Sequence, residues 1–533
     1  MSLQTTITPH SQAPYVERTY PTPAELDAAI AAAAAAQPFW AATPLAQRIA
    51  IGRAFIKEFE AMKEEIPLEL TLQMGRPVQQ GPGEVRGLVE RSNYMLDIAP
   101  TALADVSLAD TDKPGFKRYI KRVPIGVVFV IAPWNFPYLT TINSLLPALL
   151  AGNTVLLKPS PQTPLTAERI AAAFARAGLP PNVLTVLHLG PEGVAQTINA
   201  KQVGFVSFTG SVPVGRTIAE TAAKAPGFTG TGLELGGKDP AYVAPDADLD
   251  FTVAELVDGA FFNSGQSCCS IERIYVHAAV YEPFVAKFVA LTKEYKLGDP
   301  TTGHTNLGPV VSLASAERIR KQVADAVAQG ARSLVPENLF PAAKPGTTYV
   351  GPQVLVNVNH TMEVMTVRVP HFDLFGTAFF ILWSGGEPLS HVLGNPILTP
   401  SQEETFGPVV GIQRVSSATE ALELMNDSRY GLTASVWTDV ECQPRADESE
   451  YITPAELVEY TAKGEVGEGL FARMEEGLET GTVFLNRCDY LDPALAWSGV
   501  KDSGRGVSLS KFGYDQLTRP KSVHMKISLK TSV

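Results

Sequence analysis

The chain has 533 residues, 45% hydrophobic and 18% charged, which is long enough for two or more globular domains. A formal net charge of −12 without a basic cluster argues against a nucleic-acid-binding protein. Four cysteines at irregular spacing form neither a disulfide framework nor a metal motif, so we expect a reducing, cytoplasmic setting and no metal site. No apolar run is long enough to span a membrane, and no secretion signal is readable.

The first 105 residues are predicted to be mainly helical, and a regular alternation of strands and helices begins at residue 126. Residues 24–65 and 83–105 favour helices, and residues 116–123 mix apolar and basic side chains as an exposed strand does. Strands are then predicted at 126–131, 154–157, 183–187 and 204–208, each followed by a loop and a helix. Serial βα units predict an α/β fold with a doubly wound parallel sheet, and ligand groups at its strand ends. A second α/β region begins near Leu235.

Two stretches interrupt this order. Residues 367–402 contain a dense apolar patch at 374–383 and end directly before Glu404, and residues from about 441 to 464 interrupt a strand-to-helix connection. Loops this long are uncommon inside a compact domain, so we interpret both stretches as insertions. We hypothesise that one or both are translated non-coding sequence and expect them to be poorly ordered or loosely packed. A lineage-specific loop or lid is the alternative.

Three polar side chains suggest acyl chemistry. Cys268 follows a Gly-Gln turn, and a thiolate that attacks a carbonyl needs a base and an oxyanion donor. Glu234 lies between an apolar strand and two glycines, where a carboxyl group can have a raised pKa and act as a base. Asn135 lies in a turn that Trp134 and Pro137 would stiffen. A buried structural cysteine, an ordinary strand-end carboxylate and an Asx turn are the alternatives.

Six short segments in this order resemble the aldehyde dehydrogenase superfamily, NAD(P)-dependent enzymes that oxidise aldehydes to carboxylic acids. They are Pro133-Trp134-Asn135-Phe136-Pro137, Lys158-Pro159-Ser160, Phe208-Thr209-Gly210-Ser211, Glu234-Leu235-Gly236-Gly237-Lys238, Gly265-Gln266-Ser267-Cys268 and Glu404-Thr405-Phe406-Gly407-Pro408. The resemblance covers residues 20–530 apart from the insertions. It implies that Cys268 forms a thiohemiacetal and then a thioester, and that Glu234 activates the deacylating water. Asn135 and the Cys268 backbone N–H would hold the oxyanion, and Cys269 would be a packing residue.

The resemblance also implies NAD or NADP as the cofactor. Lys158 would contact the adenosine ribose, Gly210 and Ser211 the pyrophosphate, and Glu404 and Phe406 the nicotinamide ribose and ring. The full set of expected cofactor residues is Trp134, Lys158, Ser160, Gly210, Ser211, Leu235, Glu404 and Phe406. Each could instead be an ordinary loop or cap residue. Many NAD-preferring members carry Glu where this chain has Pro161, which makes use of NADP more plausible, and Ser144 replaces an ammonium found in many members.

The substrate tunnel implied by the resemblance is uncharged. Its lining residues would be Thr140, Asn143, Ser267, Cys269 and Trp497. No arginine is clearly placed to receive a substrate carboxylate, although Arg487 lies nearby in the sequence. The substrate is therefore expected to be a small-molecule aldehyde of undefined identity.

The family pattern also divides the chain. Residues 1–107 and 125–235 would form the cofactor domain, 236–505 the catalytic domain, and 108–124 with 516–533 the strands of a homodimer or homotetramer. A CoA-acylating relative usually lacks the base that Glu234 supplies, which argues against that activity. The remaining alternative is a catalytically impaired or structural relative, and the insertions keep it open.

Overall fold

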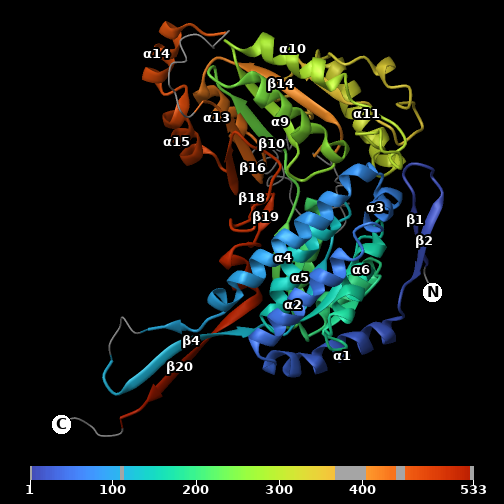
Figure 1. Ribbon diagram of the computed structural model, residues 1–533, viewed down its shortest axis with the longest axis vertical. Coiled ribbons are helices and arrows are strands. Elements are labelled where there is room, and N and C mark those ends of the chain that lie inside the picture. Colours follow the sequence, from blue (N-terminus) through green and yellow to red (C-terminus); the bar gives the residue numbers. More distant parts are fainter. Residues whose placement is uncertain (1–2, 109–112, 366–403, 440–450, 529–533) are drawn as a thin grey trace, which may run out of the picture.

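The computed structural model describes residues 3–108, 113–365, 404–439 and 451–528. Figure 1 shows two α/β bodies, one above the other, with a long β extension projecting from the lower body. The lower body holds most of the chain up to residue 235, and the upper body holds most of the remainder. The predicted α/β architecture with two domains and a small β element is confirmed.

The lower body is built on a six-stranded sheet in the order β19-β9-β8-β5-β6-β7. The strands from β9 to β7 pair in parallel, and only β19 is antiparallel. Their bounds are β5 Val127–Ile131, β6 Thr154–Lys158, β7 Leu184–Val186, β8 Val203–Thr209, β9 Gly230–Glu234 and β19 Gly504–Arg505. The four strands predicted between residues 126 and 208 are therefore all present, as is the doubly wound order.

Alternate residues of these buried strands face opposite sides of the sheet, so the lower body has two cores. Val128 and Val130 of β5 face a cluster with Phe55, Phe174 and Leu145, whereas residues 127, 129 and 131 face the opposite cluster. One face is covered by α2 Leu45–Glu60, α4 Pro82–Ala102, α5 Pro137–Leu150 and α6 Pro164–Arg176, and the other by α1 Pro23–Ala42, α7 Pro191–Asn199 and α8 Val212–Lys224. Burying both faces explains why β5 is apolar at every position.

The upper body is built on a seven-stranded sheet in the order β12-β13-β14-β11-β10-β16-β17. All of its pairings are parallel except that of β12 with β13. The bounds are β10 Asp239–Val243, β11 Ile271–His277, β12 Arg332–Ser333, β13 Gln353–Val356, β14 Val409–Val415, β16 Thr433–Trp437 and β17 Thr482–Leu485. Helices α9 Leu249–Phe261 and α10 Tyr281–Thr292 cover one face, and α11 Leu313–Ala328, α13 Ala418–Asn426 and α15 Gly467–Gly477 cover the other.

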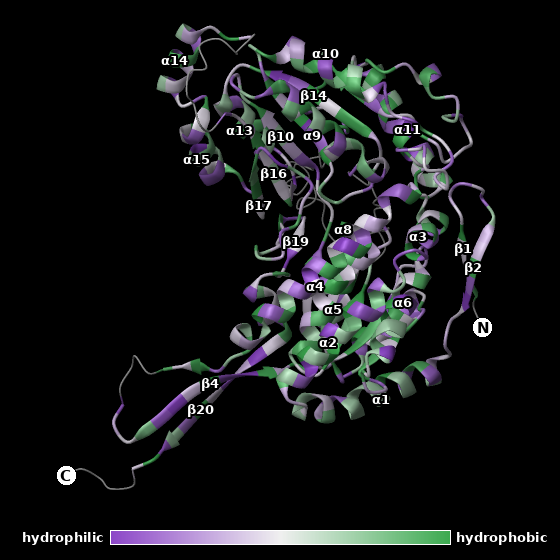
Figure 2. Cartoon of the chain, in the orientation of Figure 1, coloured by the Kyte–Doolittle hydropathy of each residue, from purple (hydrophilic) through white to green (hydrophobic). Residues whose placement is uncertain are grey.

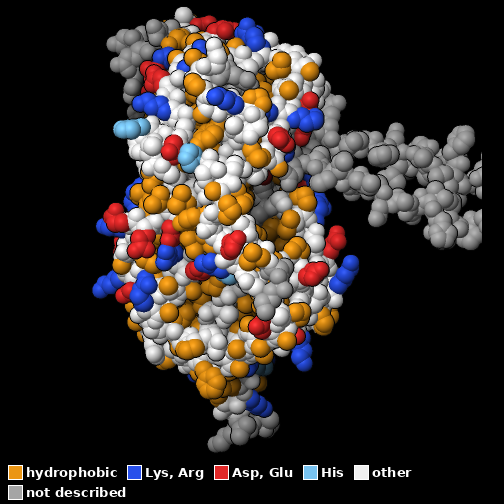
Figure 3. All heavy atoms as spheres, turned by 90° about the vertical axis from the view of Figure 1, so that its right-hand side faces the viewer, with side chains coloured by type: hydrophobic (Ala, Val, Ile, Leu, Met, Phe, Trp, Pro, Cys, Tyr) orange, Lys and Arg blue, Asp and Glu red, His pale blue; other side chains and the backbone are white. Residues whose placement is uncertain are grey.

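Short elements complete both bodies. They are α3 Ile66–Met74, η1 Val78–Gln80, η2 Phe262–Gly265, η3 Glu337–Leu339, η4 Lys511–Leu517, β15 Tyr430–Gly431 and β18 Val500–Lys501. Within the described ranges, no helix combines the length and apolar character needed to cross a membrane. Charged side chains of both signs are interspersed with hydrophobic ones on the face shown in Figure 3.

The projecting extension is a three-stranded antiparallel sheet, which we call the arm. It contains β3 Val106–Ser107, β4 Phe116–Pro124 and β20 Thr518–Lys526, with Thr518 opposite Pro124 and Lys526 opposite Phe116. Both long strands are rich in hydrophilic residues, as Figure 2 shows, and β20 is almost entirely exposed. Strand β3 pairs with β4 of the arm, and β19 pairs with β9 of the sheet in the lower body.

The N-terminus contains a hairpin that the sequence analysis missed. Strands β1 Leu3–Ile7 and β2 Pro14–Thr19 pair with each other beside the lower body. Gln4 Nε2 and Thr6 Oγ1 both donate to the carbonyl oxygen of Pro161, at 3.0 and 2.8 Å. The hairpin is therefore fixed to the loop that follows β6.

The structure describes only part of the two expected insertions. The first, residues 367–402, lies outside the described residues. In the second, helix α14 Pro454–Lys463 begins with a Thr453–Glu456 capping box, and Ile452 before it is 6% exposed. No side chain of α14 is buried. Of the two expected states, poorly ordered or loosely packed, the helix within residues 451–464 shows the second.

Candidate active site

The nucleophile loop begins where α9 ends. Asn263, Ser264 and Gly265 have positive φ angles of 52°, 58° and 68°, which turn the chain sharply before Cys268. A Cβ atom on Gly265 would lie 2.2 Å from the carbonyl oxygen of Gly407, so only glycine lets the two loops touch. The Gly-Gln-x-Cys and Glu-x-Phe-Gly-Pro segments are therefore in direct backbone contact. Cys268 itself is partly exposed.

The paired glycine after Glu234 brings a third segment to the same place. A Cβ atom on Gly237 would lie 2.3 Å from the carbonyl oxygen of Cys268. The Gly237 N–H points to the Glu404 carboxylate, with an N–O distance of 3.4 Å. The close packing of this glycine thus explains why the motif needs a residue without a side chain here.

Asn135 lies in the turn between β5 and α5, beside the nucleophile loop. Its Nδ2 donates to the carbonyl oxygen of Gln266 at 3.2 Å. Its own carbonyl oxygen accepts a hydrogen bond from Arg76, whose Nε also donates to Asn263 Oδ1 at 3.1 Å. Arg76 therefore joins the turn that carries Asn135 to the loop that carries Cys268.

Glu84 completes this buried network. It pairs with Arg76 at 2.9 Å, and the two side chains are 0% and 1% exposed. Its second oxygen accepts the backbone N–H groups of Tyr138 and Leu139, at 3.2 and 3.1 Å, in the first turn of α5. A carboxylate at a helix N-terminus satisfies N–H groups that have no partner within the helix. The sequence analysis did not single out either Arg76 or Glu84.

Glu234 is held by two hydroxyl groups at the end of β9. Ser508 Oγ donates to its Oε1 at 2.5 Å, and Thr209 Oγ1 donates to its Oε2 at 3.2 Å. Burial raises the pKa of the Glu234 carboxyl, and the two hydroxyls and the nearby Arg91 guanidinium oppose that shift. A carboxyl group with a raised pKa is suited to accept a proton near neutral pH.

The expected adenosine and phosphate residues lie at the ends of β6 and β8, the two strands that flank β5. Lys158 ends β6 and lies beside the end of β5, and Ser211 caps α8 after β8. Burial lowers the pKa of the Lys158 ammonium to about 8, and no partner for it is found within the described part of the chain. Ser160 Oγ accepts the Gln162 N–H at 3.2 Å. The Gly210 N–H donates to the Glu234 carbonyl oxygen, so this group is already engaged.

The expected nicotinamide side is fixed by a buried ion pair. Lys238 and Glu272 are 2.5 Å apart with side chains 0% and 2% exposed, and Glu272 accepts the N–H groups of Thr405 and Phe406. The rings of Phe406 and Trp134 meet edge to face at 5.5 Å between centroids. Burial and the neighbouring Glu272 carboxylate raise the pKa of Glu404 well above its ordinary value.

The expected substrate side contains one charged residue that the sequence analysis missed. Asp489 accepts hydrogen bonds from Ser267 Oγ at 3.0 Å and Cys269 Sγ at 2.9 Å. Cys269 is buried beside Cys268, and Leu235 is buried against Gly215 of α8. Ser144 Oγ lies 2.8 Å from Ser207 Oγ and carries no charge.

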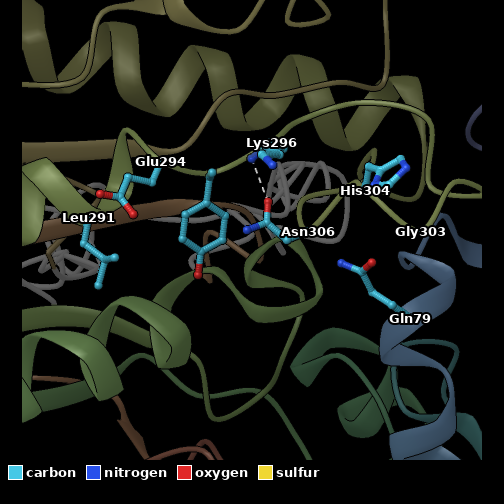
Figure 4. Close-up of a pocket in the computed structure, with 8 residues that line it drawn as sticks. Gln79, Leu291, Glu294, Lys296, Gly303, His304 and Asn306 are labelled. Carbon is cyan, nitrogen blue, oxygen red and sulfur yellow. Dashed lines mark hydrogen bonds between the residues drawn. The ribbon is translucent and has the colours of Figure 1, made fainter.

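A separate hollow lies at the edge of the upper body. Figure 4 shows its residues, which come from the end of α10, the following loop and η1. The hollow has a volume of about 550 Å³ and is lined by Gln79, Leu291, Glu294, Tyr295, Lys296, Gly303, His304 and Asn306. None of the expected site residues lines it, so it has no part in the chemistry considered below.

The chain is similar in sequence to known aldehyde dehydrogenases. The sequence matches the Aldehyde dehydrogenase family over residues 2–369 and 396–451. It is 32% identical over 501 residues to succinate-semialdehyde dehydrogenase [NADP(+)] 1 of Mycobacterium ulcerans, with 94% of each chain covered. It is 31% identical to the succinate semialdehyde dehydrogenase [NAD(P)+] Sad of Escherichia coli K12, with 94% of this chain and 93% of that one covered.

Solved structures give the same result for the fold. A crystal structure of PnpE in complex with nicotinamide adenine dinucleotide superposes with a TM-score of 0.82 at 26% identity, covering 100% of this chain and 96% of that one. An aldehyde dehydrogenase from Brucella melitensis biovar abortus 2308 gives a TM-score of 0.81 at 26% identity, covering 98% and 94%. The chain therefore belongs to the aldehyde dehydrogenase family.

Proposed function

We propose that the protein oxidises an aldehyde to its carboxylic acid with NAD⁺ or NADP⁺, through a covalent intermediate on Cys268. The observation that carries the proposal is the meeting of three loops at Cys268. Gly265 touches Gly407, Gly237 touches the Cys268 carbonyl, and Asn135 bonds to Gln266. These contacts bring Asn135 and the segment that follows Glu234 to the loop that carries Cys268, which supports the roles of nucleophile, oxyanion donor and base that we propose for the three residues.

The first half of the reaction builds the thioester. The Cys268 thiolate attacks the aldehyde carbon, and the carbonyl oxygen becomes an oxyanion that Asn135 Nδ2 and the Cys268 N–H stabilise. Bound NAD(P)⁺ supplies the hydride acceptor. Loss of hydride from the thiohemiacetal carbon leaves an acyl group on the Cys268 sulfur.

The second half releases the acid. Glu234 takes a proton from a water molecule, and the resulting hydroxide attacks the thioester carbon. The carbon–sulfur bond breaks, the acid leaves, and Cys268 returns as a thiolate. Ser508 and Thr209 each donate to one Glu234 oxygen, so each oxygen keeps a lone pair that can accept the proton from water.

The cofactor residues fit a dinucleotide that carries an extra phosphate. The buried Lys158 ammonium is available to ribose hydroxyls or to a 2′-phosphate. The following Pro161 offers no carboxylate, and its carbonyl oxygen is already bonded to Gln4 and Thr6. We therefore propose that NADP⁺ is accepted at least as well as NAD⁺, as the names of the relatives suggest for those proteins.

The substrate and one alternative function remain to be considered. The relatives' names favour succinate semialdehyde as the aldehyde. A catalytically impaired relative is favoured only by the insertion before Glu404. Intact Cys268, Glu234 and Asn135 support an active enzyme.

One assay tests the proposed function. Purified protein would be given NAD⁺ or NADP⁺ and a panel of aldehydes, with and without CoA, and reduced cofactor would be followed by absorbance. We expect acid formation that does not depend on CoA and that disappears in Cys268→Ala while cofactor still binds. Cys269→Ala is the matched control and should retain turnover. Acyl-CoA formation, or full activity in Cys268→Ala, would contradict the proposal.

We also propose that the arm mediates homodimer or homotetramer formation in the cytoplasm. The support is the exposed edge strand β20, since the unpaired side of an edge strand is commonly covered by a partner. Light scattering at micromolar concentration should give a mass of at least two chains of 57.1 kDa. The three cysteines of the described residues are free, which suits a reducing compartment.

A further inference from the structure

The segment after β17 lies beside the loop that carries Cys268. Asp489 bonds to Ser267 and Cys269, the residues on either side of the nucleophile. The next residue, Tyr490, donates from its hydroxyl to Glu90 of α4 at 2.9 Å. The segment therefore bridges the nucleophile loop and the lower body.

Two apolar residues of this segment, Leu491 and Trp497, pack in the same cluster as Cys268 and Cys269. Ser267 and Cys269 are both 3% exposed, whereas Asp489 is only partly buried. The Asp489 carboxylate therefore bonds to both neighbours of Cys268 and is itself partly exposed.

The nearby arginines already have other partners. Arg76 bonds to Glu84, the Asn135 carbonyl and Asn263. Arg91 donates to the Leu139 carbonyl and to Asn143 Oδ1, at 2.9 and 3.2 Å. Arg487 is exposed and lies 3.6 Å from the centroid of the Tyr490 ring. None of the three pairs with Asp489 in the described structure.

We propose that Asp489 makes this enzyme discriminate against aldehydes that carry a carboxylate, and that its substrates are uncharged. The inference rests on the proposed function and defines the substrate class of that site. A carboxylate on the substrate would approach the Asp489 carboxylate without a cation between them, and like charges at short range repel strongly where water is excluded. This class differs from the substrate that the relatives' names state.

The discrimination should depend on pH. Burial raises the pKa of Asp489 to about 7, and the nearby Asp258 carboxylate adds to this rise. The hydrogen bonds from Cys269 and Ser267 and the charge of Arg76 lower the pKa and only partly offset the effect of burial. A carboxylate substrate can be admitted if Asp489 first binds a proton. That step becomes tenfold less favourable for each pH unit above the pKa, so the penalty is about tenfold at pH 8 and vanishes near pH 6.

The test compares succinate semialdehyde with its uncharged methyl ester in the full-length enzyme. The measured quantity is the ratio of kcat/KM for the ester to kcat/KM for the anion, between pH 6 and pH 8. A general loss of activity in a variant cancels in this ratio. We expect the wild-type ratio to rise about tenfold over this range. In Asp489→Asn this ratio of kcat/KM values should be low and constant over the same pH range. Substitution of the exposed Asp492 by asparagine is the matched control, and its ratio should change with pH as in the wild type.

Three results would overturn the inference. The first is a ratio in Asp489→Asn that equals the wild-type ratio at pH 8. The second is a selective loss of succinate semialdehyde oxidation in Arg487→Gln, which would make that arginine a carboxylate receptor. The third is oxidation of neither aldehyde with either cofactor, which would also overturn the proposed function. If Asp489→Asn oxidises the ester normally and its ratio equals that of the wild type, the role of Asp489 is rejected and the proposed function still stands.

Discussion

Replacing Arg76 by lysine should show whether the buried network positions the oxyanion donor. Arg76 makes three hydrogen bonds in different directions, to Glu84, to the Asn135 carbonyl and to Asn263. A lysine keeps the charge beside Glu84 but lacks the planar fork that reaches all three acceptors. Loss of one hydrogen bond to a charged group lowers stability by about 2 kcal/mol.

The kinetic effect should be larger than the loss of stability alone implies. Removing an oxyanion donor outright lowers kcat by about 10²–10³-fold, and a displacement of about 1 Å can lower a rate by up to about 100-fold. Arg76→Lys loosens the turn but keeps the Asn135 side chain, so the oxyanion donor is present and less firmly positioned. We therefore expect the burst of reduced cofactor to slow by about tenfold. Stopped-flow absorbance would measure the burst, and thermal unfolding would measure stability.

A surface pair provides the matched control. Arg53 pairs with Asp97 on the outside of the lower body, with side chains 41% and 65% exposed. Exposed pairs of this kind contribute about 0–1 kcal/mol, so Arg53→Lys should leave both burst and stability unchanged. If Arg76→Lys lowers the unfolding temperature but leaves the burst rate at the wild-type value, then Arg76 is only a structural residue and the positioning argument is wrong.

Two further predictions concern Glu234 as the base and the Lys158 ammonium as a contact of the cofactor. Glu234→Gln should slow steady-state turnover but leave the burst, because the base acts after hydride loss; equal loss of both would refute this role. In the wild type, deacylation should rise with pH through the raised pKa of Glu234, since only its carboxylate accepts a proton. Lys158→Met should raise the KM for NADP⁺ more than for NAD⁺. Because the Lys158 ammonium loses its proton above a pKa of about 8, wild-type KM for NADP⁺ should rise between pH 7 and pH 9, and a flat profile would argue against that contact.

Local sequence pattern identified most of the fold. Continuous apolar runs predicted β5, β6 and β8 because those strands are covered on both faces. Helix α14 was missed although its Thr-Pro-Ala-Glu start is a readable capping box, because the stretch around it had been interpreted as foreign. The hairpin β1–β2 was missed as well, although β1 alternates between exposed and buried residues.

The site was only partly predictable for a different reason. Cys268, Glu234 and Asn135 lie in short motifs whose spacing is visible in the sequence. Their supporting residues act across the fold, as Ser508 lies 274 positions from Glu234 and Asp489 lies 222 from Ser267. A single aspartate or serine far along the chain carries no local signal of such a contact. The motif residues could therefore be proposed from the sequence, whereas the contacts of Ser508 and Asp489 required the three-dimensional structure.

Deleting the first insertion should leave the catalytic body intact. The chain on either side is fixed by residues outside the insertion, since Met365 is 0% exposed and Glu272 accepts the N–H groups of Thr405 and Phe406. The family match also omits residues 370–395. We therefore expect deletion of 367–402 to give at least as much soluble protein, with an unchanged KM for cofactor. The shorter deletion of 370–395 is the matched control. Loss of soluble protein in both deletions, or a raised cofactor KM in the shorter one, would mean that the insertion is a structural element that helps to place Glu404.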